Sequence, residues 1–91
     1  MKIEAKMSED LKIDIQAKFD KCTSKTVLET TTAYYVYKDI EAGLDIKNMD
    51  RSRLVCFFQF LRKYELKHPK DYNASKLSLK VKCIIEGIDM P

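Results

Sequence analysis

The 91-residue chain contains one histidine, two glycines and no tryptophan. General acid–base and nucleophilic catalysis need a base and an orienting group that converge on one site. A single His68 offers few such combinations, and no catalytic or nucleotide-binding motif is present in the sequence. We therefore expect a protein that is not an enzyme and that uses no cofactor.

The cysteines are also few. Their number is odd and their spacings are wide, which fits neither a disulfide framework nor a CxxC pair. Together with the histidine they make four residues of the type that binds zinc: Cys22, Cys56, Cys83 and His68. None of them lies at the short spacings of structural zinc motifs, so we expect no metal site. Cys56 and Cys83 are interpreted as small core residues.

Long apolar runs are absent as well. No segment approaches the ~20 apolar residues of a membrane span, and the amino terminus lacks the apolar segment of a signal peptide. We expect a cytoplasmic protein with no membrane contact. A chain of 91 residues with 45% hydrophobic content predicts one small domain, residues 1–91, with a thin core.

Basic side chains outnumber acidic ones in the second half of the chain. The net charge is +3, but residues 1–45 carry 7 basic and 9 acidic side chains, whereas residues 46–91 carry 10 and 5. Within residues 51–82 the ratio is 9 basic to 2 acidic. Positive charge is thus concentrated where it can attract a polyanion.

Residues 3–19 alternate between apolar odd positions and polar even positions. This period of two is typical of a half-buried strand, with a bulge at residues 8–10. A helix that begins after Ser8 is the alternative, because four apolar residues would then share one face: Leu11, Ile15, Phe19 and Cys22.

Residues 26–38, TVLETTTAYYVYK, are rich in β-branched and aromatic side chains. They predict a second strand, paired with the first as a hairpin. The alternative is a helix over residues 27–42, because Thr26 and Glu29 form a capping box and Gly43 stands where a helix-ending glycine would.

Residues 50–67 predict an amphipathic helix. Asp50 is its N-cap, and the helix ends before Pro69. Its apolar residues recur at intervals of three and four: Leu54, Phe57, Phe58, Leu61 and Tyr64. Cys56 and Phe60 widen this stripe beyond what one sheet face would cover, which favours a homodimer.

Residues 70–75, KDYNAS, predict a turn. Residues 76–86 contain KLSLKVKCI, in which lysines alternate with apolar residues, and they predict a further strand. The predicted fold is therefore α+β: a small antiparallel sheet, made from the N-terminal hairpin and a C-terminal strand, with one amphipathic helix packed on one face. The alternative fold is rich in helix, with helices at 27–42 and 50–67.

In the α+β interpretation the uncovered sheet face carries tyrosines among lysines. Flat rings for stacking and cations for phosphates are the two components of single-strand recognition. The candidate nucleic-acid-binding residues are Arg62, Lys63, Lys67, Lys70, Lys76, Lys80, Lys82, Tyr35 and Tyr37. An ordinary solvated face is the simpler interpretation of the same residues.

The functional prediction is a small basic regulatory protein that binds nucleic acid. RNA or a single strand is favoured, because no helix-turn-helix pattern is evident. The alternative is an interaction protein that binds another protein without nucleic-acid contact, such as an antitoxin or a phage-encoded inhibitor that counters host defence, through the helix stripe or an exposed strand edge.

Overall fold

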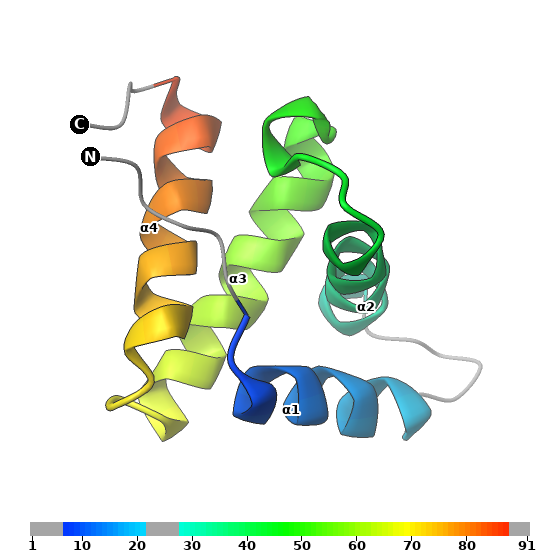
Figure 1. The fold of residues 1–91 in the computed structure, drawn as a ribbon, viewed down its shortest axis with the longest axis vertical. Coiled ribbons are helices and arrows are strands. Elements are labelled where there is room, and N and C mark those ends of the chain that lie inside the picture. The colour runs from blue at the N-terminus through cyan, green and yellow to red at the C-terminus, as the bar shows by residue number, and fades with distance from the viewer. Residues whose placement is uncertain (1–6, 22–27, 88–91) are drawn as a thin grey trace.

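The computed structural model describes residues 7–21 and 28–87, and this part of the chain folds into four α-helices and one short 3₁₀ helix (Figure 1). The elements are α1 (Glu9–Asp20), α2 (Leu28–Glu41), η1 (Ile46–Asn48), α3 (Arg51–Lys67) and α4 (Tyr72–Glu86). No strand occurs within the described residues. The predicted α+β fold is therefore wrong, and the protein is a small helical bundle.

The first predicted strand is helix α1. The Ser8 hydroxyl caps it by accepting a hydrogen bond from the Leu11 amide at 3.2 Å. Leu11 and Ile15, four residues apart, are buried, whereas Ile13 between them is 63% exposed. The alternation was misleading because two of its apolar positions, Ile13 and Ala17, face solvent. Residues 3–6 of the predicted strand and Cys22 lie outside the described residues.

The second predicted strand is helix α2, in agreement with the alternative interpretation. Ala33 and Val36 are fully buried at helical spacing, so tertiary packing outweighs the poor helix propensity of the threonines and tyrosines. Phe19 of α1 stacks on Tyr34 of α2, with ring centroids 3.8 Å apart. Thr26, the first residue of the proposed capping box, lies outside the described residues.

Gly43 ends α2 as the sequence indicated. Its φ of +91° lies in the region that favours glycine. The Gly43 amide donates to the Ile40 carbonyl and the Leu44 amide to the Asp39 carbonyl, both at 3.0 Å. These two bonds form a Schellman motif, which satisfies carbonyls at the helix end.

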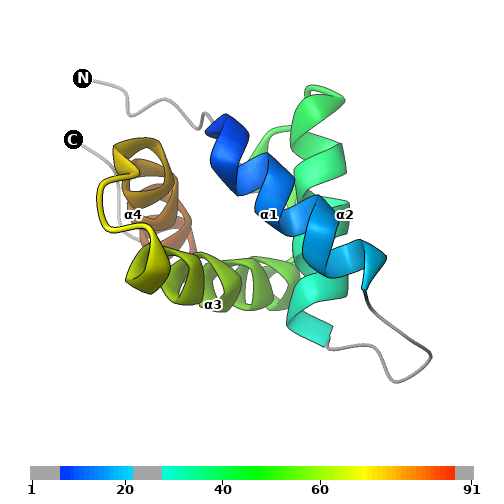
Figure 2. The same ribbon diagram turned by 90° about the horizontal axis from the view of Figure 1, so that it is seen from below.

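The predicted helix at residues 50–67 is confirmed as α3. It follows Asp50, which stands at the N-cap position but whose side chain makes no capping hydrogen bond, and it ends at Lys67, before Pro69. It is the central element, since it packs against both α2 and α4 (Figures 1 and 2). These two neighbours account for its wide apolar stripe within one chain. The homodimer therefore stays a prediction that has lost this support.

The third predicted strand is helix α4. Residues 70–75, interpreted as a turn, hold its N-cap Asp71 and its first turn. Its buried residues recur at helical spacing: Ala74, Leu77, Ser78 and Val81. Gly87 ends it with a φ of +71°.

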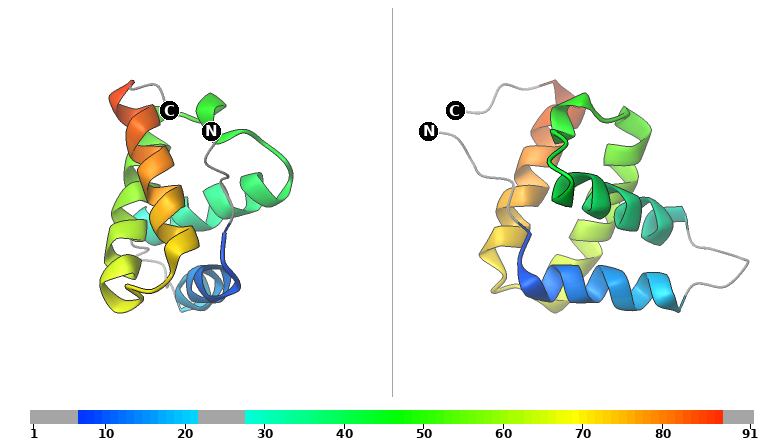
Figure 3. Two further views of the ribbon diagram at one scale, coloured as in Figure 1. Left: turned by 60° about the vertical axis from the view of Figure 1, so that its left-hand side comes forward. Right: turned by 45° about the vertical axis from the view of Figure 1, so that its right-hand side comes forward.

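Helix α1 crosses the base of the molecule and packs on α2, and its first turn lies near the junction of α3 and α4 (Figure 3). The helices enclose one core among the described residues: Met7, Leu11, Ile15, Ala33, Val36, Ile46, Leu54, Phe57, Phe60, Leu61, Tyr64, Ala74, Leu77 and Val81.

Candidate nucleic-acid interface

Asp71 fixes the start of α4 relative to two other helices. Its Oδ1 accepts a hydrogen bond from the Ala74 amide at 3.1 Å, which caps α4. Its Oδ2 accepts from the hydroxyl of Tyr64 on α3 at 2.6 Å and from the hydroxyl of Ser8, the N-cap of α1. We call Ser8, Tyr64 and Asp71 the polar junction. It holds the beginning of α4, and with it the lysines that follow, in a defined position.

The polar junction shifts two pKa values in opposite directions. Burial raises the pKa of the Asp71 carboxyl, but hydrogen bonds from Ser8, Tyr64 and the Ala74 amide outweigh it, so the pKa lies below its ordinary value. Burial, together with the hydrogen bond to Asp71, raises the pKa of Tyr64 well above that of an ordinary tyrosine. The junction is therefore built from an ionised carboxylate and a neutral phenol.

Ser8, Asp71 and His68 are residue types found in catalytic triads, but their arrangement here is structural. The His68 ring stacks on the Tyr64 ring at 4.3 Å. The Ser8 hydroxyl donates to Asp71 rather than to an imidazole, and Asp71 is occupied by donors from three residues. A serine nucleophile needs a base that accepts its proton and is oriented by a third group. The junction does not supply that order of contacts.

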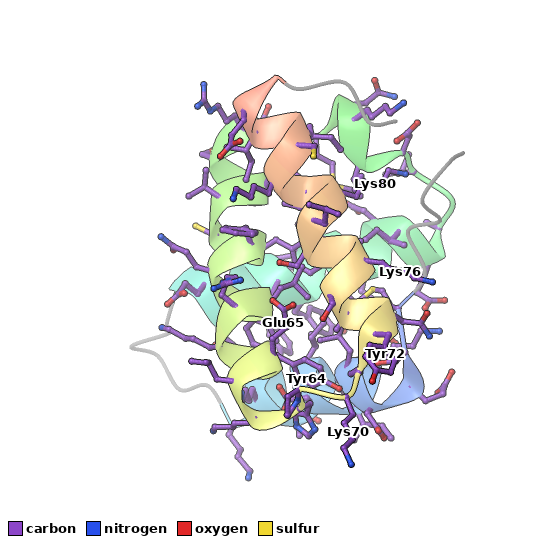
Figure 4. All side chains as sticks on the ribbon, turned by 90° about the vertical axis from the view of Figure 1, so that its left-hand side faces the viewer. Tyr64, Glu65, Lys70, Tyr72, Lys76 and Lys80 are labelled. Atoms are coloured by element: carbon purple, nitrogen blue, oxygen red, sulfur yellow. The ribbon has the colours of Figure 1, made fainter. Side chains whose placement is uncertain are left out.

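Three lysines and one tyrosine line the outer side of α4 and the turn before it. Figure 4 shows Tyr72, Lys76 and Lys80 along one side of the helix, with Lys70 below its start. Residues four apart lie on the same side of a helix, which is why positions 72, 76 and 80 line up. We call these four residues the basic edge.

The basic edge is open to a ligand. Tyr72 is 70% exposed, Lys70 and Lys76 are exposed and Lys80 is half-buried. Within the described part of the chain, none of the three lysines forms an ion pair with a carboxylate. The edge therefore presents uncompensated positive charge beside an accessible aromatic ring.

Glu65, one of the two acids within residues 51–82, does not neutralise this edge. It lies between α3 and α4, on the opposite side of α4 from Lys76 and Lys80 (Figure 4). Its Oε2 is buried and accepts no hydrogen bond from the described residues. The other acid, Asp71, is held in the polar junction.

Two of the predicted binding residues lie elsewhere, beside α2. The Lys63 ammonium is 2.7 Å from the Glu29 carboxylate of α2. Arg62 and Lys63 line a shallow hollow of about 380 Å³ together with Glu29, Phe58 and Gln59. The ion pair compensates the charge of Lys63, so this residue is not grouped with the basic edge.

Lys67 and Lys82 flank the basic edge without belonging to it. Lys67 is exposed at the last position of α3, before the turn that carries Lys70. Lys82 is exposed on α4, but residues two apart on an α-helix lie about 200° apart around the axis. Lys80 and Lys82 therefore point in different directions, whereas in the predicted strand they shared a face.

The two predicted stacking tyrosines are on α2 and belong to an aromatic cluster. Tyr35 is 53% exposed, and its ring meets the rings of Phe19 and Tyr34 edge to face. Tyr37 is half-buried against the core, with the Lys38 ammonium 4.9 Å from its ring centre. Because no sheet exists in the described residues, Tyr35 and Tyr37 do not share a face with the α4 lysines.

Tyr72 is the aromatic residue that the sequence reasoning missed. The sequence of residues 70–75 predicts a turn, and a turn places Tyr72 on no face of a helix or strand. The available signal was the spacing of four between Tyr72, Lys76 and Lys80, which becomes visible once the segment is treated as a helix capped by Asp71.

The described residues show no group of three His, Cys, Asp or Glu side chains that could hold a metal ion. Cys56 and Cys83 are both free thiols and half-buried. None of the helices in residues 7–21 and 28–87 has the length and apolarity needed to cross a bilayer. Searches with the chain find no matching family model, no matching curated protein and no matching solved structure.

Proposed function

We propose that this protein binds single-stranded nucleic acid, RNA or DNA, through the basic edge. The observation that supports the proposal most directly is the row of Lys70, Tyr72, Lys76 and Lys80, in which three cations without acidic partners in the described chain flank a 70% exposed ring. Cations bind the phosphates and the ring stacks on a base.

The exposed ring is the reason to prefer a single strand. A base in a duplex is already stacked on its neighbours, whereas an unpaired base has free faces for an aromatic side chain. The lack of an evident helix-turn-helix pattern in the sequence does not disfavour a duplex, because the described residues fold into helices. Preference for a single strand therefore depends on Tyr72 alone.

The proposal predicts a salt-dependent affinity of limited steepness. With three lysines on the phosphates, a plot of log K against log salt should have a slope of about −2, since each phosphate contact on a single strand contributes about −0.7. Lys76→Ala/Lys80→Ala removes two of these contacts and should reduce the slope to about −0.7. Anisotropy titrations with labelled oligonucleotides at several salt concentrations measure both.

A matched control removes two other exposed cations. Lys21→Ala/Lys38→Ala changes the net charge by the same amount, directly after α1 and on α2 rather than on α4. This variant should retain most of the affinity and nearly the same slope. If both double variants weaken binding equally, the interaction depends on net charge and the basic edge is not the site.

The tyrosines test the stacking. Tyr72→Ala should cost about 1–3 kcal/mol of binding and leave the melting temperature unchanged, because the ring is mostly in solvent. Tyr35→Ala, at a tyrosine that is also exposed but lies on α2, should leave binding unchanged. Equal losses from both variants would remove Tyr72 from the site.

No binding to any RNA or DNA at low ionic strength would overturn the proposal. The predicted alternative, an inhibitor or antitoxin that binds another protein, would then be the function to pursue. A pull-down from lysate treated with nuclease distinguishes the two classes, because an association mediated by nucleic acid is lost and a direct protein partner is retained.

A further inference from the structure

Helix α1 presents an outward surface that is acidic and partly apolar. Its five exposed residues are Glu9, Asp10, Ile13, Ala17 and Asp20. At 3.6 residues per turn they fall within a stripe about 100° wide, opposite the buried Leu11 and Ile15. We call this stripe the acidic face.

Among the described residues, the lysines of α1 neutralise the acidic face in part, because Lys12 pairs with its member Glu9. The Lys12 ammonium is 2.9 Å from the Glu41 carboxylate of α2, and the Lys18 ammonium is 3.1 Å from Asp14. Lys12 also lies 3.6 Å from Glu9, at the edge of the face. Lys21, which is an exposed cation, follows the last residue of the helix.

The outer side of α4 is complementary in charge and similar in composition. It carries the basic edge together with Leu79, which is 49% exposed, and Tyr72, which is 70% exposed. Glu86, the last residue of α4, is the helix's only acid. Both surfaces thus combine charge of one sign with exposed apolar side chains, as the rim and centre of protein interfaces do.

The lengths of the two surfaces also match. With a rise of 1.5 Å per residue, Asp10 and Asp20 are about 15 Å apart along α1, and Tyr72 and Lys80 are about 12 Å apart along α4. Ile13 (63% exposed) and Ala17 lie between the two acids. Two such helices placed side by side bring carboxylates to ammonium groups and apolar side chains together.

The two surfaces belong to different sides of one molecule. Helix α1 lies across the bottom and α4 along the left edge in Figure 1. We therefore propose that the acidic face of one copy docks on the α4 surface of a second copy. Because the two surfaces differ, a head-to-tail dimer still has one free acidic face and one free α4 surface. Further copies can therefore bind at either end.

This association uses lysines that the proposed function assigns to nucleic acid. Lys76 and Lys80 cannot bind a carboxylate face and a phosphate chain at the same time, so single-stranded nucleic acid should compete with self-association. The competition rests on the proposed function, whereas the self-association does not, and the two are tested separately.

The first experiment is sedimentation velocity on nuclease-treated full-length protein at low ionic strength. The average mass should rise with protein concentration and fall when salt is added, since exposed charges are screened beyond about 10 Å at 0.1 M salt. A wild-type protein that stays monomeric at every concentration at low salt would overturn the proposal.

Charge exchange identifies the surfaces. Asp10→Lys/Asp20→Lys makes both surfaces basic, and Lys76→Glu/Lys80→Glu makes both acidic, so each variant alone should be monomeric. An equimolar mixture should associate again, because every contact then joins opposite charges. Variants that still associate alone, or a mixture that stays monomeric, would exclude these surfaces. Thermal melting followed by circular dichroism verifies that both variants fold.

Ile13→Ser tests the apolar part of the contact without altering charge. The side chain is exposed, so the fold should be retained and self-association should weaken.

Addition of an oligothymidylate to the associated wild-type protein tests whether nucleic acid competes with self-association. Dissociation supports both proposals, and self-association with no oligonucleotide binding refutes the function while the head-to-tail contact stands. Simultaneous binding of both partners would overturn the competition.

Discussion

Among single residues, Asp71 connects three helices, because its carboxylate accepts hydrogen bonds from Ser8 before α1, Tyr64 of α3 and the Ala74 amide of α4. Asp71→Asn keeps a side chain that caps helices well but removes the charge that accepts hydrogen bonds from Ser8 and Tyr64. We expect a loss of about 1–2 kcal/mol of folding free energy at neutral pH, since bonds to a partly exposed charge are worth less than buried ones. Urea denaturation measures it.

The same residue predicts an acid dependence. Because the pKa of folded Asp71 is lowered, its contribution is present above its unfolded pKa of about 4 and is lost as the pH falls through the folded value. The stability difference between wild type and Asp71→Asn should therefore shrink toward pH 3. A difference that is constant with pH would mean that the charge is not what stabilises the junction.

Tyr64 predicts that folding stability also depends on pH in the alkaline range. Its pKa is raised, so its contribution is present below the unfolded pKa of about 10 and is lost as the pH rises through the folded value. Tyr64→Phe retains the ring that packs in the core but loses the hydroxyl. This variant should be less stable than wild type at neutral pH and approach it in strong alkali, as measured by denaturation across that range.

The backbone conformation of Gly43 determines how much folding free energy is lost when another residue replaces it. Apart from Gly43 itself and its two chain neighbours, no heavy atom of the described residues lies within 4 Å of a Cβ added there, so Gly43→Ala meets no steric obstacle from packing. The φ of +91° alone should cost roughly 1–2 kcal/mol. An alanine variant of unchanged stability would show that the turn after α2 can adopt another conformation.

At the scale of the element, substitutions in α1 distinguish a helix from a strand over the same residues. A strand places Ile13 and Ile15 on the same face, whereas the helix buries Ile15 and exposes Ile13. Ile15→Ala should cost about 2–5 kcal/mol, and Ile13→Ala should stay within about 0.5 kcal/mol. Equal losses in thermal or urea denaturation would support the strand.

The elements differed in how far their sequence predicted them. Residues 51–67 were identified because their apolar residues repeat at three and four and a proline limits the end. Residues 28–41 were not, because threonine and tyrosine favour strands unless packing supplies the energy, and burial of Ala33 and Val36 supplies it. In residues 76–86 the alternating lysines obscured the helical spacing of Leu77 and Val81.

At the scale of the whole molecule, α3 contacts both α2 and α4, so we expect the described helices to unfold as one cooperative unit. Leu61→Ala, at a fully buried position of α3, should cost about 2–5 kcal/mol, a large share of the roughly 5–15 kcal/mol of a small domain. Helix content by far-ultraviolet dichroism and tyrosine packing by near-ultraviolet dichroism should be lost together. Separate transitions would show that α4 melts independently.

The sequence predicted where the positive charge of the candidate site lies, but not how its residues are arranged in space. Counting side chains located the positive charge in residues 51–82, and the structure places the basic edge within that range. The partners of the lysines could not be read from the sequence, since the pairing of Lys63 with Glu29 joins residues 34 apart. The error in secondary structure also moved the aromatic component from Tyr72 to Tyr35 and Tyr37.

The hydrogen bond between Ser8 and Asp71 joins residues 63 positions apart. Closing so long a loop costs more chain entropy than pairing neighbouring helices, so the contact is expected late on the folding pathway. The hairpin of α3 and α4 needs only the short turn between them. The start of α1 should therefore dock on α4 late and detach early, whereas the rest of α1 packs on α2, its neighbour in sequence. The Leu11 amide, which Ser8 caps, should exchange with deuterium before the amides of α3.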